Sequence, residues 1–153
     1  MATNLRRATL ADATTIRELT RQAYAKWVPL IGREPRPMTV NYDRAVVDHM
    51  IDLYEIDGEA VGLIEVVPQA QHLLIKNIAV RLDQQGKRIG DLLLKHAEDT
   101  VRALYLAELR LYTNVAFVSN IEFYSHRGFD EFGRETLAVG GVVVHMKKMI
   151  ELA

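Results

Sequence analysis

The spacing of hydrophobic residues switches along the chain between the three-to-four-residue period of a helix and the two-residue period of a strand. This switching predicts a mixed α/β domain rather than a helical bundle or a β-sandwich. A length of 153 residues fits one domain, 1–153, with a substantial core. The pattern predicts strands at residues 5–8, 51–56, 60–67, 72–80, 109–113, 132–138 and 142–149. It predicts helices from a capping box at residues 9–12 to about Trp27, at 43–50, from Ile89 to about Leu106, and at about 119–127.

The connections between these segments indicate how the sheet is assembled. Asp57-Gly58 joins two strands and favours a tight antiparallel hairpin. Strand 109–113 follows strand 72–80 through a long helix, and a crossover of this length predicts a parallel pair. Residues 28–38 hold three of the four prolines, so no regular helix is expected there.

Composition excludes several classes of function. The chain has 19 basic and 20 acidic side chains and a net charge of -1, which argues against nucleic acid as its main partner. No cysteine is present, so disulfides and thiolate chemistry are excluded. The first residues lack the apolar core of a signal peptide, and no apolar run approaches the roughly 20 residues of a membrane span. We therefore expect a cytoplasmic protein with no membrane partner. The five histidines show no metal-ligand spacing, so no metal site is expected.

The segment 80–94 contains the most informative motif. A strand ends there, a turn with Gly86 and Gly90 follows, and an amphipathic helix opens at Ile89. Glycines let a ligand approach the main chain, and the first N–H groups of a helix attract anions. The segment therefore predicts a phosphate site, although a plain helix cap would have a similar sequence.

Two motifs together resemble the GCN5-related N-acetyltransferase (GNAT) family. The first runs from Gln85 to Gly90, and the second is Asn-Ile-Glu-Phe-Tyr-Ser-His-Arg-Gly-Phe at 120–129. The family motif is (Gln/Arg)-x-x-Gly-x-(Gly/Ala), and Arg88 stands where its middle glycine is usual. The resemblance covers nearly the whole chain. It implies an α/β fold with a mixed, mostly antiparallel central sheet that is splayed between strands 4 and 5 and flanked by helices on both faces.

The resemblance also implies acetyl-CoA as cofactor. Its pantetheine arm would lie between the two splayed strands, against the backbone of Ile78 and Val80, and the pyrophosphate would lie on the turn. Asn120 matches a position near the pantetheine, and Asn114, which follows the last residue of the parallel strand, is a second candidate. Either asparagine could instead cap a turn or a helix. The implied cofactor-binding residues of the turn are Gln85, Gly86, Lys87, Arg88, Ile89 and Gly90.

Tyr124 matches the general acid of the family. A tyrosine hydroxyl, with an ordinary pKa near about 10, can protonate a departing CoA thiolate at neutral pH. Packing of the helix end against Gly128 and Phe129 is the alternative role for Tyr124. For the general base we consider Glu65, or a water held by Asn77 or His72, while a solvated edge residue is the alternative for Glu65. A backbone N–H at about Val80 would hold the oxyanion.

The segment 28–38 is predicted to form the acceptor wall. Trp27 and Met38 offer apolar surface, and Arg33 and Arg36 could meet a carboxylate or phosphate. A plain packing loop is the alternative for this segment. The predicted activity is acetyl transfer from acetyl-CoA to a primary amine, a small molecule or a peptide, by direct attack in a ternary complex.

Two other classes of function are alternatives. A CoA-binding sensor or interaction domain of the same fold would lack catalysis. A dinucleotide-binding domain fits poorly, since G-x-G-x-x-G is missing. The final hairpin, 132–149, would suit edge pairing in a homodimer.

Overall fold

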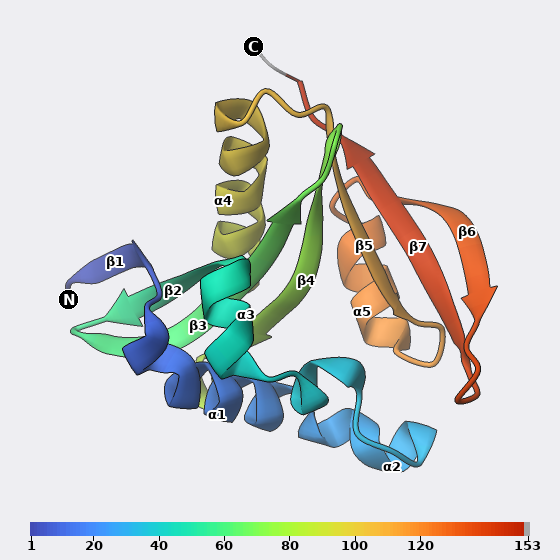
Figure 1. The fold of residues 1–153 in the computed structure, drawn as a ribbon, viewed down its shortest axis with the longest axis horizontal. Coiled ribbons are helices and arrows are strands. Elements are labelled where there is room, and N and C mark those ends of the chain that lie inside the picture. The colour runs from blue at the N-terminus through green and yellow to red at the C-terminus, as the bar shows by residue number, and fades with distance from the viewer. Residues whose placement is uncertain (152–153) are drawn as a thin grey trace.

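The computed structural model describes residues 1–151. A mixed β-sheet forms the centre of the fold (Figure 1). Within these residues the sheet has seven strands in the order β1-β2-β3-β4-β5-β7-β6. The pair β4–β5 is parallel and the other neighbouring pairs are antiparallel. The strands are β1 (Thr3–Arg7), β2 (Met50–Ile56), β3 (Glu59–Pro68), β4 (His72–Val80), β5 (Glu108–Asn114), β6 (Asp130–Thr136) and β7 (Val142–Met149).

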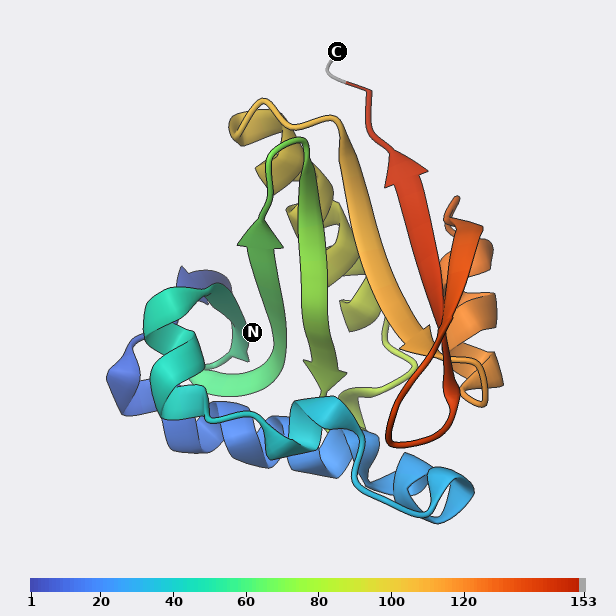
Figure 2. The same cartoon turned by 45° about the vertical axis from the view of Figure 1, so that its right-hand side comes forward.

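Helices cover both faces of the sheet, as predicted (Figure 2). On one face α4 (Ile89–Ala103) packs through Leu93, Ala97 and Val101, and α5 (Val118–Ser125) lies beside it. On the other face α1 (Ala13–Tyr24) and α3 (Tyr42–Asp48) enclose a second apolar cluster. The remaining helical turns are α2 (Val28–Ile31) and the 3-10 turns η1 (Leu10–Asp12), η2 (Ala25–Trp27), η3 (Arg36–Thr39) and η4 (Leu82–Gln84). No helix within residues 1–151 is long and apolar enough to cross a membrane.

The two central strands separate partway along their length, which confirms the predicted splay. The pairing of β4 with β5 covers only His72–Ile75 against Glu108–Leu111. Beyond this point β4 stays paired with β3 as far as Val80, and β5 stays paired with β7 as far as Asn114. The sheet is therefore open between the second halves of β4 and β5 (Figure 1).

A β-bulge at the start of the opening changes which side chains face each helical layer. Glu65 pairs with Asn77 and the next residue, Val66, pairs with Ile75, so Lys76 is the extra residue on β4. Ile75 joins the cluster under α4, whereas Ala79 joins the cluster under α1 and α3. The bulge thus turns Asn77 toward α1 and α3, where its amide contacts their side chains.

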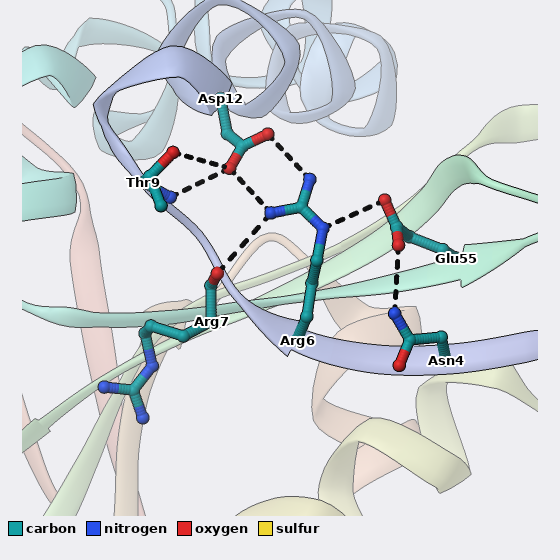
Figure 3. A network of polar contacts seen from close by, with 6 residues as sticks. All are labelled: Asn4, Arg6, Arg7, Thr9, Asp12 and Glu55. Atoms are coloured by element: carbon teal, nitrogen blue, oxygen red, sulfur yellow. Dashed lines mark hydrogen bonds and ion pairs between the residues drawn. The ribbon is translucent and has the colours of Figure 1, made fainter.

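A polar network fixes the first strand against the start of α1 (Figure 3). The Arg6 guanidinium donates to both oxygens of Asp12 at 2.8 and 2.9 Å and to Glu55 of β2 at 3.1 Å. Asp12 also accepts the backbone N–H of Thr9 at 2.8 Å, which confirms the predicted capping box. These hydrogen bonds lower the pKa of Asp12 to about 2, with the contact to Arg6 as the largest cause.

Most predicted elements are present, with shifted ends. Strands 72–80 and 142–149 have the predicted bounds, and the turn at Asp57-Gly58 has positive φ at both residues. The long helix ends at Ala103 rather than near Leu106, and the chain reverses at Tyr105 with φ 58°. The segment 28–38 does contain the short helix α2, because Pro29 stands in its first turn, where proline is tolerated.

Candidate active site

Two cavities flank the opening between β4 and β5. The first has a volume of about 270 Å³ and lies among β4, β5, the segment after α2 and the β6–β7 hairpin. The second has a volume of about 510 Å³ and lies among the end of α1, the turn before α4, and α5. Four residues line both cavities: Tyr24, Ile78, Asn120 and Tyr124. The two spaces therefore meet at these side chains.

The second half of β4 presents backbone groups to the opening. The Arg81 N–H donates to Val61 of β3 at 2.8 Å. Since successive residues of a strand direct their backbone groups to alternate sides, those of Ile78 and Val80 are directed away from β3. Both residues line the second cavity, as expected for a ligand that adds to this strand. The carbonyl of Val80 accepts a hydrogen bond from the Gln85 side chain at 3.0 Å.

The turn before α4 is exposed and has the geometry of an anion site. Gly86 has φ 81°, and a Cβ at this position would meet no atom within 4 Å, so the main chain is accessible. The first N–H groups of a helix lack partners within the helix, and α4 begins at Ile89 beside this cavity. Gln85, Gly86, Arg88, Ile89 and Gly90 line the cavity, whereas Lys87 does not.

Gly90 also lets α5 pack closely against the start of α4, because a Cβ at this position would lie 3.1 Å from the Phe123 ring. The residue lines the second cavity, and its contact with a ligand remains a prediction. The Arg127 guanidinium covers the Phe123 ring at 3.7 Å and forms an ion pair with Asp91. This pair lowers the pKa of Asp91 and neutralises a carboxylate in the first turn of α4. An anion at this helix end therefore meets little repulsion from Asp91.

Tyr124 lies where the two cavities meet. Its ring packs edge-on against Phe123 and Phe129, and its carbonyl accepts the Phe129 N–H at 3.1 Å. The helix-end packing considered as an alternative is thus present, but it leaves the residue in the wall of both cavities. Burial raises the pKa of Tyr124 above its ordinary value. The side chain stays a neutral hydroxyl donor at neutral pH.

A second tyrosine, absent from the sequence prediction, lies beside the first. Tyr24 ends α1 and lines both cavities. Its pKa is raised, chiefly by burial and next by the proximity of Tyr124. Thr20 and Tyr24 are four residues apart on α1, and the Thr20 hydroxyl accepts the Asn77 amide at 2.9 Å. Thr20 and Tyr24 therefore lie on the same side of α1. This spacing of two hydroxyl side chains is the sequence signal that could have identified Tyr24 as a site residue.

Glu65 lies in the wall of the first cavity and is only 2% exposed, so its interpretation as a solvated edge residue was wrong. Its Oε2 lies 2.6 Å from Nδ1 of His49. Asn77, on the facing strand, lines the same cavity, and its amide also donates to the Tyr42 hydroxyl at 3.3 Å. His72 lies at the closed end of β4 and lines neither cavity, so it cannot hold a water there.

The segment after α1 contributes only part of the predicted acceptor wall. Arg33 and Arg36 line the first cavity, and Arg33 donates to Gly140 of the β6–β7 turn at 3.3 Å. Trp27 instead lines the second cavity, because η2 continues α1 and stacks the indole on Phe117 at 4.4 Å between ring centroids. Met38 is 7% exposed within η3 and lines neither cavity.

The two asparagines differ in their surroundings. Asn114 lines the first cavity, and its Oδ1 accepts the Ala116 N–H at 2.9 Å, as in a turn cap. Asn120 lines both cavities from the first turn of α5. Asn120 is therefore better placed for a ligand that passes from one space to the other.

The charges around the first cavity are mixed. Lys76 donates to the Tyr112 hydroxyl at 3.3 Å, and His145 lies 3.2 Å from Glu135. No cluster of three or more metal-binding side chains occurs among residues 1–151. Several lining residues have no role that the sequence predicts, namely Tyr24, Lys76, Tyr112, Glu135, His145 and Arg127.

Comparison with known proteins gives the chain's relatives. The model of the acetyltransferase (GNAT) family matches residues 14–129. A search of curated proteins finds no match. Among solved structures, the PaiA N-acetyltransferase of Thermoplasma acidophilum in complex with coenzyme A is similar with a TM-score of 0.79 and 21% identity, over 97% of this chain and 99% of that chain.

Two further structures share the fold. A GNAT family acetyltransferase from Elizabethkingia anophelis with acetyl-CoA bound has a TM-score of 0.77 and 16% identity, over 97% of this chain and 98% of its own. The ribosomal-protein-S18-alanine N-acetyltransferase of Escherichia coli has a TM-score of 0.74 and 17% identity, over 99% and 96% of the two chains.

Proposed function

Because the chain belongs to the acetyltransferase (GNAT) family, we propose that it transfers the acetyl group of acetyl-CoA to a primary amine within a ternary complex. The observation that carries this proposal is the meeting of two cavities at Tyr124, between strands that separate beyond Ile75. One cavity ends at a helix N-terminus, and the other contains a buried carboxylate. These are suitable surroundings for a phosphate-bearing donor and for an amine, respectively.

The second cavity is the proposed place of acetyl-CoA. The pyrophosphate would lie on the turn from Gln85 to Gly90, where Gly86 leaves the main chain open. The pantetheine would lie along Ile78 and Val80, whose backbone groups are directed to the opening. The thioester would then reach Tyr124 and Asn120, and the backbone N–H near Val80 would stabilise the oxyanion.

These residues fit direct attack of the amine on the thioester, with Glu65 as base and Tyr124 as acid. An ammonium acceptor gives one proton to Glu65, and the amine lone pair forms the N–C bond to the thioester carbon. The C–S bond breaks with its electron pair on sulfur, and Tyr124 gives its hydroxyl proton to that sulfur. The second proton lost by nitrogen restores the Tyr124 hydroxyl, and Glu65 releases its proton to solvent. General acid–base steps of this kind contribute about 10²–10⁴-fold each.

The acceptor in this proposal is a compact amine that carries an anionic group. A cavity of about 270 Å³ holds a small molecule or the end of a peptide. Arg33, Arg36 and Lys76 supply three positive charges in its wall, against the two carboxylates of Glu65 and Glu135. Such surroundings favour a carboxylate or phosphate on the acceptor and disfavour a second ammonium group.

A CoA-binding domain without catalysis is the alternative for this fold. A sensor would not need an acceptor cavity, whereas this chain keeps one open beside Tyr124. The open cavity favours the enzyme.

The first test is release of CoA thiol from acetyl-CoA across a panel of amines, with the Tyr124→Phe variant alongside. Tyr124→Phe should lower kcat about 100-fold, with little change in KM for acetyl-CoA, because it removes only the proton donor. Tyr105→Phe is the matched control, since Tyr105 is 89% exposed and lines neither cavity.

Two outcomes would contradict the assignment. A larger loss of kcat in Tyr24→Phe than in Tyr124→Phe would transfer the acid role to Tyr24. Tight binding of acetyl-CoA by calorimetry, with no amine that accelerates thiol release, would favour the non-catalytic domain.

A further inference from the structure

The carboxylate of Glu65 connects the first cavity to a histidine behind it. The Glu65 side chain is 3% exposed and lines the cavity, whereas the His49 side chain is 28% exposed and lines neither cavity. The atoms Nδ1 of His49 and Oε2 of Glu65 are 2.6 Å apart. The imidazole thus lies behind the carboxylate, with part of its ring in contact with solvent.

The other groups around Glu65 do little to stabilise its buried carboxylate. Tyr42 from α3 and Tyr24 from α1 both have raised pKa values, with burial as the main cause and the charge of Glu65 as a further one. From β4, the Asn77 amide is engaged by Thr20 and Tyr42. Lys76, the remaining charged group of β4 in this wall, is directed to Tyr112. Among residues 1–151, His49 supplies the side-chain hydrogen bond that Glu65 receives.

We propose that His49 is a positioning residue that holds Glu65 as the base for the acceptor amine. The Nδ1–H of His49 donates to Oε2, which leaves the other carboxylate oxygen free to take the proton of the ammonium group. This inference rests on the proposed function, since it requires an amine in the first cavity. His49 then sets the orientation of the base from outside the cavity.

The experiment compares four variants of the full chain in the acetyl-transfer assay. Glu65→Gln and His49→Leu should each lower kcat at least 10-fold, with KM for acetyl-CoA within about twofold of the parent. His49→Asn keeps an N–H donor near Nδ1 and should recover most of kcat.

The matched control is His96→Leu. His96 forms the same kind of pair, with its Nε2 2.7 Å from Asp52 and its side chain 29% exposed, but it lines neither cavity. His96→Leu should lower the melting temperature and leave kcat unchanged.

Three results would overturn the proposal. These are full kcat in Glu65→Gln, full kcat in His49→Leu, or equal kcat in His49→Leu and His49→Asn. If the Glu65 and His49 variants keep the kcat of the parent while Tyr124→Phe lowers it, His49 has no such role but the proposed acetyl transfer stands. If the parent transfers acetyl to no amine, the proposed function itself fails.

Discussion

Arg88 adopts a backbone conformation that suits glycine. Its φ of 63° and ψ of 22° lie in the left-handed region, directly before the first residue of α4. A residue with a Cβ is disfavoured there by roughly 1–2 kcal/mol. The sequence motif has glycine at this position, so Arg88 retains the backbone turn of the motif despite its side chain.

Arg88→Gly should therefore raise the free energy of unfolding by about 0.5–1 kcal/mol, with part of the gain offset by the greater freedom of glycine in the unfolded chain. Lys87→Gly is the control, because Lys87 is equally exposed and has no positive φ, and it should lower stability. Urea denaturation of both variants measures the difference. Equal destabilisation by the two glycines would show that Arg88 is unstrained.

The site residues that belong to a local sequence motif could be predicted from the sequence. Tyr124, Asn120 and the turn from Gln85 to Gly90 belong to such motifs, and the structure brings all of these positions to the cavities except Lys87. The pairing of His49 with Glu65 joins the end of α3 to the middle of β3, and no local pattern specifies such a contact. The direction of Met38 depends on a 3-10 turn, which proline content alone does not define.

At the scale of elements, turn residues between apolar segments made several strands predictable. Strand β4 has four buried residues at alternate positions, and its predicted bounds were correct. The bulge at Lys76 was not predictable, because it leaves that alternation intact while it exchanges the faces of the sheet. The capping box was correctly predicted, but its link to β2 through Arg6 and Glu55 is a contact between distant segments.

That link predicts how the stability depends on pH. The pKa of Asp12 is about 2 in the folded protein, against about 3.9 in an unfolded chain. Its stabilisation is present above about pH 4 and is lost as the pH falls toward 2. Asp12→Asn should lower the free energy of unfolding by roughly 1–2 kcal/mol at pH 7, after allowance for solvent screening, and by much less at pH 2.

The control for this network is Asp48→Asn. Asp48 pairs with Arg44 at 2.8 Å, but both side chains are well exposed, so the loss at pH 7 should be small. Chemical denaturation from pH 2 to 7 gives both curves. A constant difference between Asp12→Asn and the parent over this range would exclude the carboxylate of Asp12 as its cause.

At the scale of the whole molecule, segments far apart in the chain form the walls of the first cavity. Arg33 follows α2, and its partner Gly140 belongs to the turn between β6 and β7. Neither segment has a pattern that specifies this contact. The homodimer expected from the final hairpin remains a prediction, with β6 at the edge of the sheet.

The position of these arginines predicts how the acceptor is selected. Arg33→Ala and Arg36→Ala should each raise KM for an anionic amine about 10-fold. A charged hydrogen bond contributes roughly 1.5–3 kcal/mol, and in the variant a water molecule makes up part of this loss. KM for acetyl-CoA should stay constant, since neither residue lines the second cavity. Arg134→Ala is the control, on exposed β6 outside both cavities.

Steady-state kinetics with each active amine measures these constants. The proposed acceptor class would be wrong if KM stayed unchanged for every active amine in both variants.

The convergence of two cavities on one tyrosine has a consequence for the order of events. Four residues line both cavities, and all other lining residues belong to one cavity only. A proposed donor and acceptor therefore do not have to pass each other to reach Tyr124. A donor and an acceptor could enter in either sequence, and a spent carrier could leave without waiting for the acetylated product. A single compound that joins CoA covalently to an amine would occupy both spaces at once and block them together.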